Sequence, residues 1–300
     1  MLVRASVAAL VALLSALPVL ADKGTGASRS LITAVQPPAW LVESAVTTPI
    51  KPGLQVRDGD TLRTGAGGRV YIALPDHSTV KLGENTEFAA PAMDMMHDEQ
   101  GSMFRGILHI LKGVFRFTTS AVDRNERRHV DIRVGVATIG IRGTDVWGRT
   151  GSGGTLVALL EGKAKMSMPG HASMMMNQPM HYMMMPSGGG MKMNMPVTRE
   201  NVADWAAQTD LREGAGVLTR GGRWTVVLAS STNPHDVNRL MRKLAGAGYP
   251  VEGAAAMVDG RVWHRLVIRE AATYRDARAL AASLARQYPS VSPRVVPTGH

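Results

Sequence analysis

The part of the chain from residue 222 onward constrains the fold most, because its apolar pattern changes period in a fixed order. The expected segments are a strand at 224–230, a helix at 234–246, strands at 251–258 and 262–268, a helix at 277–288 and a strand at 293–296. Asp259-Gly260 between the two central strands is a strong hairpin signal. The order β-α-β-β-α-β predicts an α+β domain at 222–297, with both helices on one face of an antiparallel sheet. The other face is expected to be open.

Residues 40–165 have a different pattern, in which short strand-like runs alternate with glycine-rich turns. One example is the pair 69–74 and 79–82, which are joined by the turn Pro75-Asp76-His77-Ser78. Many short strands with closely spaced turns predict an all-β sandwich, barrel or roll. We therefore expect a multidomain chain with an N-terminal all-β domain and a C-terminal α+β domain.

The first residues have the layout of a secretory signal peptide. Arg4 supplies the basic start, residues 7–17 are apolar apart from one serine, and Val19-Leu20-Ala21 offers small residues for cleavage. We expect residues 1–21 to be removed as a signal peptide, residues 22–39 to form a linker, and the mature protein to be periplasmic. An uncleaved membrane anchor is the alternative. Export argues against nucleic acid as a partner.

Composition excludes several chemistries. The chain has no cysteine, so disulfides, cysteine–zinc sites and thiol catalysis are ruled out. A formal net charge of +10 favours an anionic partner, and cell-wall polymer or an anionic membrane surface fits with export. No His-Glu-x-x-His, Gly-x-Ser-x-Gly or dinucleotide-binding motif occurs. We expect a non-catalytic protein that uses no cofactor.

Three segments of the C-terminal unit carry a family resemblance. Trp224–Ser230, Gly248–Val251 and His264–Ile268 resemble the corresponding parts of the SPOR domain, a bacterial module that binds peptidoglycan. The resemblance spans about residues 222–296 and agrees in order, spacing and length. It implies the α+β fold, and it implies glycan strands lacking stem peptides as the partner.

The β-rich unit at 40–165 resembles a FecR domain. The resemblance rests on Val56–Gly65, Leu74–Leu82, Leu111–Phe115 and Gly143–Val146, with Leu160–Lys163 closing the set. FecR proteins proper relay iron-siderophore signals to a sigma factor across the inner membrane. Because the chain lacks the internal span that such relaying needs, the resemblance implies the fold and not the signalling. An envelope protein is the expected partner of this domain.

Strand parity divides the side chains of the C-terminal sheet between its two faces. The residues expected on the open face are Thr225, Val227, Ala229, Trp263, Arg265, Val267 and Arg269. A tryptophan beside arginines suits a glycan, because sugar C–H faces stack on an indole and guanidinium groups donate to acetamido or lactyl oxygens. The alternative is a tryptophan that covers the edge of the core. The candidate glycan-binding residues are Thr225, Val227, Trp263, Arg265 and Arg269.

Residues 166–197 are expected to form a methionine-rich loop, followed by a helix and linker at 198–221. The tract holds twelve of the nineteen methionines together with His171 and His181. The tract resembles the thioether-rich segments of periplasmic copper-handling proteins. Thioethers bind the soft ion Cu(I) without needing deprotonation. Apolar gap-filling and a sacrificial oxidant sink are the alternatives. The candidate copper ligands are Met174, Met176, Met180, His181 and Met184.

Three functional hypotheses follow. The preferred one is a non-catalytic, exported cell-envelope protein that binds peptidoglycan glycan strands through its SPOR-like domain and another protein through its FecR-like domain. The first alternative is a periplasmic Cu(I)- or Ag(I)-binding protein that uses the methionine tract. The second is a FecR-like signalling partner.

Overall fold

The computed structural model describes residues 30–43, 46–99, 101–119 and 127–299. The expected signal peptide and the first part of the expected linker lie outside these residues. The linker prediction is wrong for residues 30–36, which form strand β1 (Ser30–Gln36). β1 pairs with β6 along its length, and its side chains Ile32 and Val35 are fully buried in the hydrophobic core. No helix within the described ranges is long and apolar enough to span a membrane.

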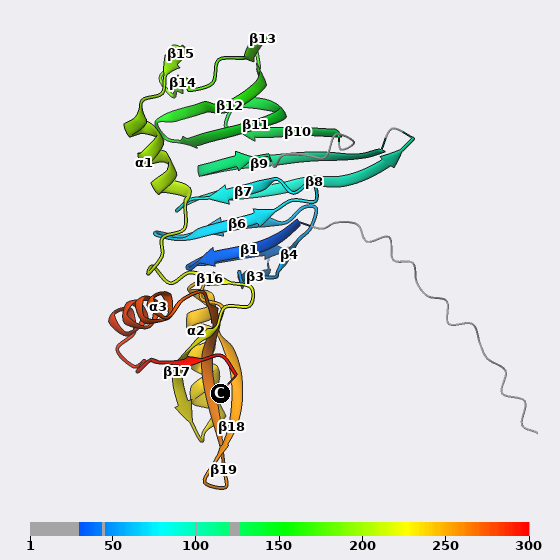
Figure 1. Cartoon of the computed structure of the whole chain (residues 1–300). Coiled ribbons are helices and arrows are strands. Elements are labelled where there is room, and N and C mark those ends of the chain that lie inside the picture. Colours follow the sequence, from blue (N-terminus) through cyan, green and yellow to red (C-terminus); the bar gives the residue numbers. More distant parts are fainter. Residues whose placement is uncertain (1–29, 44–45, 100, 120–126, 300) are drawn as a thin grey trace, which may run out of the picture.

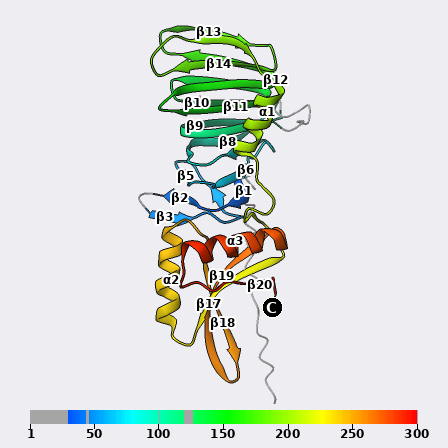
Figure 2. The same ribbon diagram turned by 90° about the vertical axis from the view of Figure 1, so that its left-hand side faces the viewer.

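The N-terminal module is a stack of strands that form two facing sheets (Figures 1 and 2). One sheet runs in the order β1, β6, β7, β9, β11, β12, β14, β15, and the other in the order β3, β2, β5, β8, β9, β10, β11, β12, β13. The strands after β1 are β2 (Ala39–Glu43), β3 (Val46–Pro49), β4 (Gln55–Val56), β5 (Thr61–Thr64), β6 (Arg69–Ala73), β7 (Thr79–Leu82), β8 (Glu87–Asp98), β9 (Gly101–Thr118), β10 (Arg127–Val134), β11 (Ala137–Gly151), β12 (Gly154–Met168), β13 (His171–Met176), β14 (His181–Pro186) and β15 (Lys192–Pro196).

Strands β9, β11 and β12 belong to both sheets because each one bends at a glycine. In β11, residues 137–141 pair with β10, whereas residues 145–150 pair with β9 in the opposite sheet. The bend contains Gly143 (φ +75°), and the adjacent bend of β12 contains Gly162 (φ +81°). A Cβ on Gly162 would collide with the carbonyl oxygen of Gly143. Only glycine combines this backbone conformation with so close an approach of two chains.

The space between the two sheets is filled by aliphatic and aromatic side chains. Phe88, Phe104, Phe115 and Phe117 are at most 1% exposed, and strand residues such as Ile72, Ile132, Ile139 and Val157 are fully buried. These residues recur at every second position, as expected for strands that present one face to a core. The predicted all-β architecture of this module is confirmed, and its form is a two-sheet roll.

The prediction that residues 166–197 form a loop is wrong, because most of them form β12, β13, β14 and β15. β13 and β14 lie end to end along β12, with Met174 paired to Met166 and Met183 paired to Val157. The otherwise unpaired edge of β12 supplies the backbone hydrogen-bonding groups that draw the tract into strands. Alternate methionines then point into the core, where Met176 and Met183 are 8% and 3% exposed.

Helix α1 (Arg199–Thr209) follows β15 and runs along the side of the strand stack toward the C-terminal module (Figures 1 and 2). Thr198 caps it as expected, through a capping box with Asn201. The indole of Trp205 stacks on Trp147 with 4.6 Å between ring centroids, and Trp147 Nε1 donates to the Trp205 carbonyl at 3.1 Å. The predicted helix is therefore packed against the roll rather than suspended in a linker.

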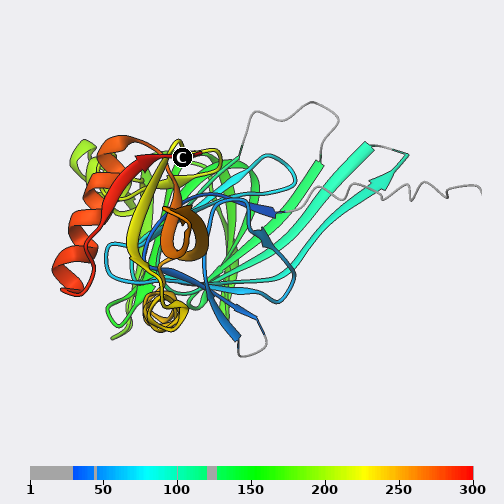
Figure 3. The same cartoon turned by 90° about the horizontal axis from the view of Figure 1, so that it is seen from below.

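The C-terminal module has the predicted order β-α-β-β-α-β, with its sheet arranged as β18, β19, β17, β20. Its elements are β17 (Trp224–Ser231), α2 (Pro234–Gly246), β18 (Glu252–Val258), β19 (Arg261–Ala271), α3 (Tyr274–Gln287) and β20 (Arg294–Pro297). Viewed from below, both helices lie on one side of the strands (Figure 3). Val237, Leu244, Ala277 and Leu284 of the helices are buried with Val226 and Ile268 of the sheet.

The two modules form one continuous unit through β16 (Leu218–Thr219). This short strand pairs with β1 through Val35 and with β19 through Ala271. A second contact lies after α2, where Ala39 N donates to the Gly248 carbonyl at 3.1 Å. Trp40 Nε1 donates to the Gly246 carbonyl, also at 3.1 Å. The N-terminal roll therefore rests on the end of α2 and on the adjacent edge of the sheet.

Replacing Gly248 by alanine is expected to weaken this junction. Gly248 has φ +83°, and an added Cβ would lie 2.6 Å from Cε2 of Trp40. The left-handed conformation alone costs alanine about 1–3 kcal/mol, and overpacking against the indole adds to it. We expect a lower free energy of unfolding by urea denaturation. Gly246→Ala is the matched control, because an added Cβ there meets nothing within 4 Å; equal destabilisation by both changes would contradict the prediction.

Candidate functional site

The helix-free face of the C-terminal sheet carries the predicted tryptophan and arginines along β19. Across the strand pair, Trp263 lies opposite Ala256 and Arg265 opposite Ala254 of β18. Because the alanine side chains are short, the indole of Trp263 and the guanidinium of Arg265 project beyond them on this part of the face. Trp263 and Arg265 are both half-buried, which leaves each accessible from solvent while its base is held by neighbours.

An ion-pair network marks the end of this face nearest the N-terminal module. Glu252 accepts from Lys51 Nζ at 2.9 Å, and Arg269 Nε lies 3.5 Å from the second carboxylate oxygen. Part of the charge of Arg269 is therefore neutralised within the protein, and Lys51 is contributed by the other module. Arg265, in contrast, makes no ion pair among the described residues. Its charge is therefore more available to a ligand than that of Arg269.

Two of the five candidate glycan-binding residues are less accessible. Thr225 is 4% exposed, and its Oγ1 lies 3.1 Å from Oγ1 of Thr298. Val227 is half-buried and pairs with Val267, which is itself 3% exposed. The structure therefore brings together Trp263, Arg265 and Arg269 as surface groups, whereas Thr225 is enclosed by the strand pair β17–β20.

A β-bulge in β17 changes which residues reach the open face. The register shifts between Val227 and Ala229, so that Ala229 pairs with buried Leu266 and packs against the core. Strand parity had placed Ala229 on the open face, and that placement is wrong because the bulge adds one residue. Ser230, an exposed residue, instead lies opposite Arg265. Its hydroxyl is a polar group of the site that alternation alone could not identify.

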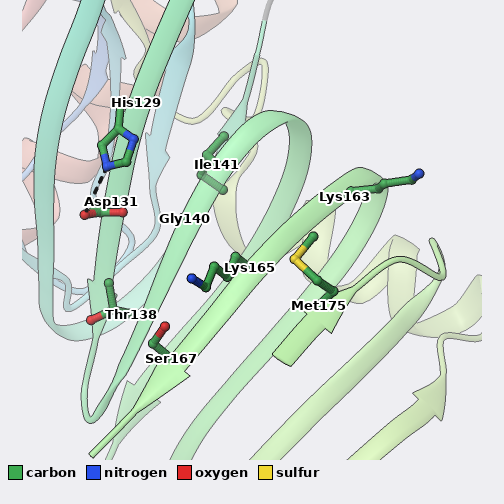
Figure 4. A pocket seen from close by; sticks show the side chains of 9 residues that line it. All are labelled: His129, Asp131, Thr138, Gly140, Ile141, Lys163, Lys165, Ser167 and Met175. Carbon is green, nitrogen blue, oxygen red and sulfur yellow. Dashed lines mark ion pairs between the residues drawn. The ribbon is translucent and has the colours of Figure 1, made fainter. Parts of the chain in front are cut away.

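The outer face of the N-terminal roll has a separate pocket of about 720 Å³ (Figure 4). Gly140 forms its floor because it has no side chain, with Asp131 and Lys165 opposite it on the flanking strands. His129 Nε2 lies 3.7 Å from an oxygen of Asp131. Lys165 extends toward the strand of Gly140, whereas Lys163 extends away from it (Figure 4). Sequence reasoning missed this pocket because it depends on the cross-strand register of β10, β11, β12 and β13, which local alternation does not give.

The methionine tract forms a third hollow, of about 270 Å³, at the end of the roll. Met174, Met176 and His181 of the candidate copper set line it. Met180 is exposed on the connection between β13 and β14, and Met184 lines a different hollow beside Gly154. Met175, Met183 and Met193 line the pocket although they were not among the candidates. Within the described residues, no three His, Asp or Glu side chains cluster as a metal site.

Comparisons with models of known protein families agree with this division into two modules. The model of the FecR protein family matches residues 60–165, and the model of the SPOR domain matches residues 221–293. No curated protein matches the chain. Two crystal structures of a candidate anti-sigma factor from Parabacteroides distasonis are similar to it at 13% identity. One covers 80% of this chain and 99% of its own with a TM-score of 0.39, and the other 79% and 97% with a TM-score of 0.38.

The FecR-matched region contains a histidine with a perturbed protonation equilibrium. His109 of β9 lies between Ala89 of β8 and Arg133 of β10. Its Nε2 is buried and meets no hydrogen-bond partner in the described part of the chain. Burial, and secondly the charge of Arg133, lower the pKa of His109 below its ordinary value. Folding therefore favours the neutral form of this imidazole over the charged form.

Stability is expected to fall on acidification because of His109. The unfolded chain binds a proton near pH ~6.5, whereas the folded chain binds it only at lower pH. The free energy of unfolding should therefore decrease as the pH falls through about 6.5 and level off below the folded-state pKa. His109→Phe removes the titrating group. The free energy of unfolding, measured with urea at pH ~7.5 and pH ~5, should therefore fall less between the two pH values in the variant than in the unchanged protein. An equal loss in both proteins would refute the assignment.

Proposed function

Because the chain carries a FecR domain and a C-terminal SPOR domain, we propose that it is a non-catalytic, exported cell-envelope protein that binds peptidoglycan. SPOR domains are found in cell-envelope proteins and bind peptidoglycan, and FecR domains suggest a signalling module. The finer proposal is that glycan strands lacking stem peptides are bound on the helix-free face of the SPOR sheet. Residues 1–21 would act as the signal peptide that delivers the protein to the periplasm.

The observation that carries this proposal is the pairing of Trp263 and Arg265 beside the short side chains of β18. Ala254 and Ala256 leave room for a sugar ring to approach the indole. Pyranose C–H faces pack against an aromatic ring. The guanidinium group of Arg265, which has no carboxylate partner among the described residues, is free to donate to sugar oxygens. Repeated sugars along a strand would let many weak contacts act together.

The FecR domain would act as the interaction module for an envelope protein. Its junction with the SPOR domain is built from β16, Trp40 and the Lys51–Glu252 ion pair. These contacts hold the two domains in one orientation, so a partner on the FecR domain would keep a set position relative to the wall. Neither domain family is catalytic, and we propose that this chain is not an enzyme either.

Binding to sacculi tests the proposal. The purified chain should co-sediment with amidase-treated sacculi, and more weakly with untreated sacculi, whose glycan strands still carry stem peptides. Trp263→Ala combined with Arg265→Ala should weaken binding by at least about tenfold, because a central aromatic and an unpaired arginine are typical dominant contacts. The measurement is the bound fraction against sacculus concentration at fixed salt.

The matched control is Arg239→Ala combined with Arg242→Ala, which removes two positive charges from the exposed side of α2. This control should bind as the unchanged chain does, because α2 covers the opposite face of the sheet. Unchanged binding by the Trp263 and Arg265 double variant would refute the site. An equal loss in the control would show that net charge, and not this face, governs binding.

A further inference from the structure

The end of the two-sheet core differs chemically from the layers below it. In one sheet, the inward row of cross-strand partners runs through Phe117, Val146 and Leu159 and ends at His181. In the other sheet, the inward row runs through Ile139 and Met166 and ends at Met174. Aliphatic and aromatic groups are thus replaced by thioethers and an imidazole in the terminal layer. These groups meet in the hollow of about 270 Å³ described above.

The ligand-bearing strands are held in place by the ladder of β12. Met176 of β13 pairs with Ala164, and His181 of β14 pairs with Leu159. β15, which carries Met193, is paired in turn to β14. The sulfur-bearing side chains therefore project from a connected sheet edge. This arrangement lowers the ordering cost that weakens metal binding by a flexible loop.

The hydrogen bond of His181 selects the tautomer that a metal ion needs. Nδ1 of His181 lies 3.0 Å from the carbonyl oxygen of Pro179. A carbonyl oxygen only accepts, so Nδ1 carries the hydrogen and the lone pair of the neutral ring is on Nε2. Metal-bound histidines are commonly oriented in this way by a backbone carbonyl.

Packing alone does not account for the composition of the pocket. Met176 and Met183 are 8% and 3% exposed and fill the core, but Met175 and Met193, which also line the pocket, are 58% and 51% exposed. Exposed methionines contribute little to burial. The remaining lining groups include the amides Asn177, Gln178 and Asn194, and no carboxylate lines the pocket among the described residues. The donor set is therefore soft, which suits a soft ion better than a hard one.

We propose that this pocket binds a soft monovalent cation, Cu(I) or its analogue Ag(I), through Nε2 of His181 and the thioethers of Met174, Met176 and Met183, with the exposed Met193 also lining the pocket. Thioethers and a neutral imidazole need no deprotonation to bind, so the site functions without a thiolate. The set keeps three of the five candidates from the sequence and replaces Met180 and Met184, which face elsewhere. The site is separate from the SPOR sheet and does not depend on peptidoglycan binding.

Anaerobic competition with the chromophoric Cu(I) chelator bathocuproine disulfonate tests the proposal on the full chain. The unchanged protein should withdraw one Cu(I) per chain from the chelator. Met174→Leu, Met176→Leu and Met183→Leu together keep the side-chain volume while removing the sulfurs. This triple variant should bind Cu(I) at least about a hundredfold more weakly, and His181→Gln should do so about tenfold more weakly.

Three methionines outside the tract provide the control: Met96→Leu, Met241→Leu and Met257→Leu together should leave both stoichiometry and affinity unchanged. Thermal unfolding followed by circular dichroism establishes whether each variant is folded. If the triple variant does not fold, the Cu(I) affinity of His181→Gln alone tests the site. Equal affinity in the unchanged protein and in a folded His181 or triple variant would overturn the proposal. So would a loss in the control variant as large as in the triple variant, because binding would then follow methionine number.

Discussion

Unpaired strand edges are the constraint on which the rest of this structure depends. Every layer of the roll leaves backbone N–H and C=O groups along its edge, and buried groups of this kind must be paired. At one end, β1 meets this requirement by pairing with β16, which continues the ladder into β19. At the other end, β13 and β14 share the edge of β12. The same requirement thus joins the two domains and orders the methionine tract.

Three glycines at bends decide where the candidate functional surfaces lie. The corners at Gly143 and Gly162 allow β11 and β12 to serve both sheets, which closes the core while leaving an outer face over β10 to β12. The turn at Gly248 brings the end of α2 against Trp40, which joins the two domains beside the SPOR helices. The proposed glycan, protein and metal surfaces therefore lie on separate parts of one connected β framework.

The parts of the structure that follow from local periodicity were predictable from sequence. The helical stripe from Val237 to Leu244 and the Asp259-Gly260 turn define the SPOR elements without any knowledge of partners. Features that depend on which strands pair, and in which register, were not predictable from sequence. Ala229 and Ser230 exchange faces at a bulge, and β1 joins the sheet although its residues precede two prolines. The methionine tract has no strong strand propensity, so only the edge of β12 makes it a strand.

The terminal layer of the roll has two structural requirements that aliphatic β-branched residues do not satisfy together. It has to cover the apolar interior beneath it, and it has to end the stack without presenting another flat, β-branched surface that would recruit a further strand. Methionine is apolar enough for the inward positions of Met176 and Met183, and it is flexible enough to leave no rigid ridge at the exposed ones. A cap made in this way concentrates sulfur around the imidazole of His181. The side chains that terminate the β stack are therefore the same ones that we propose to hold a soft cation.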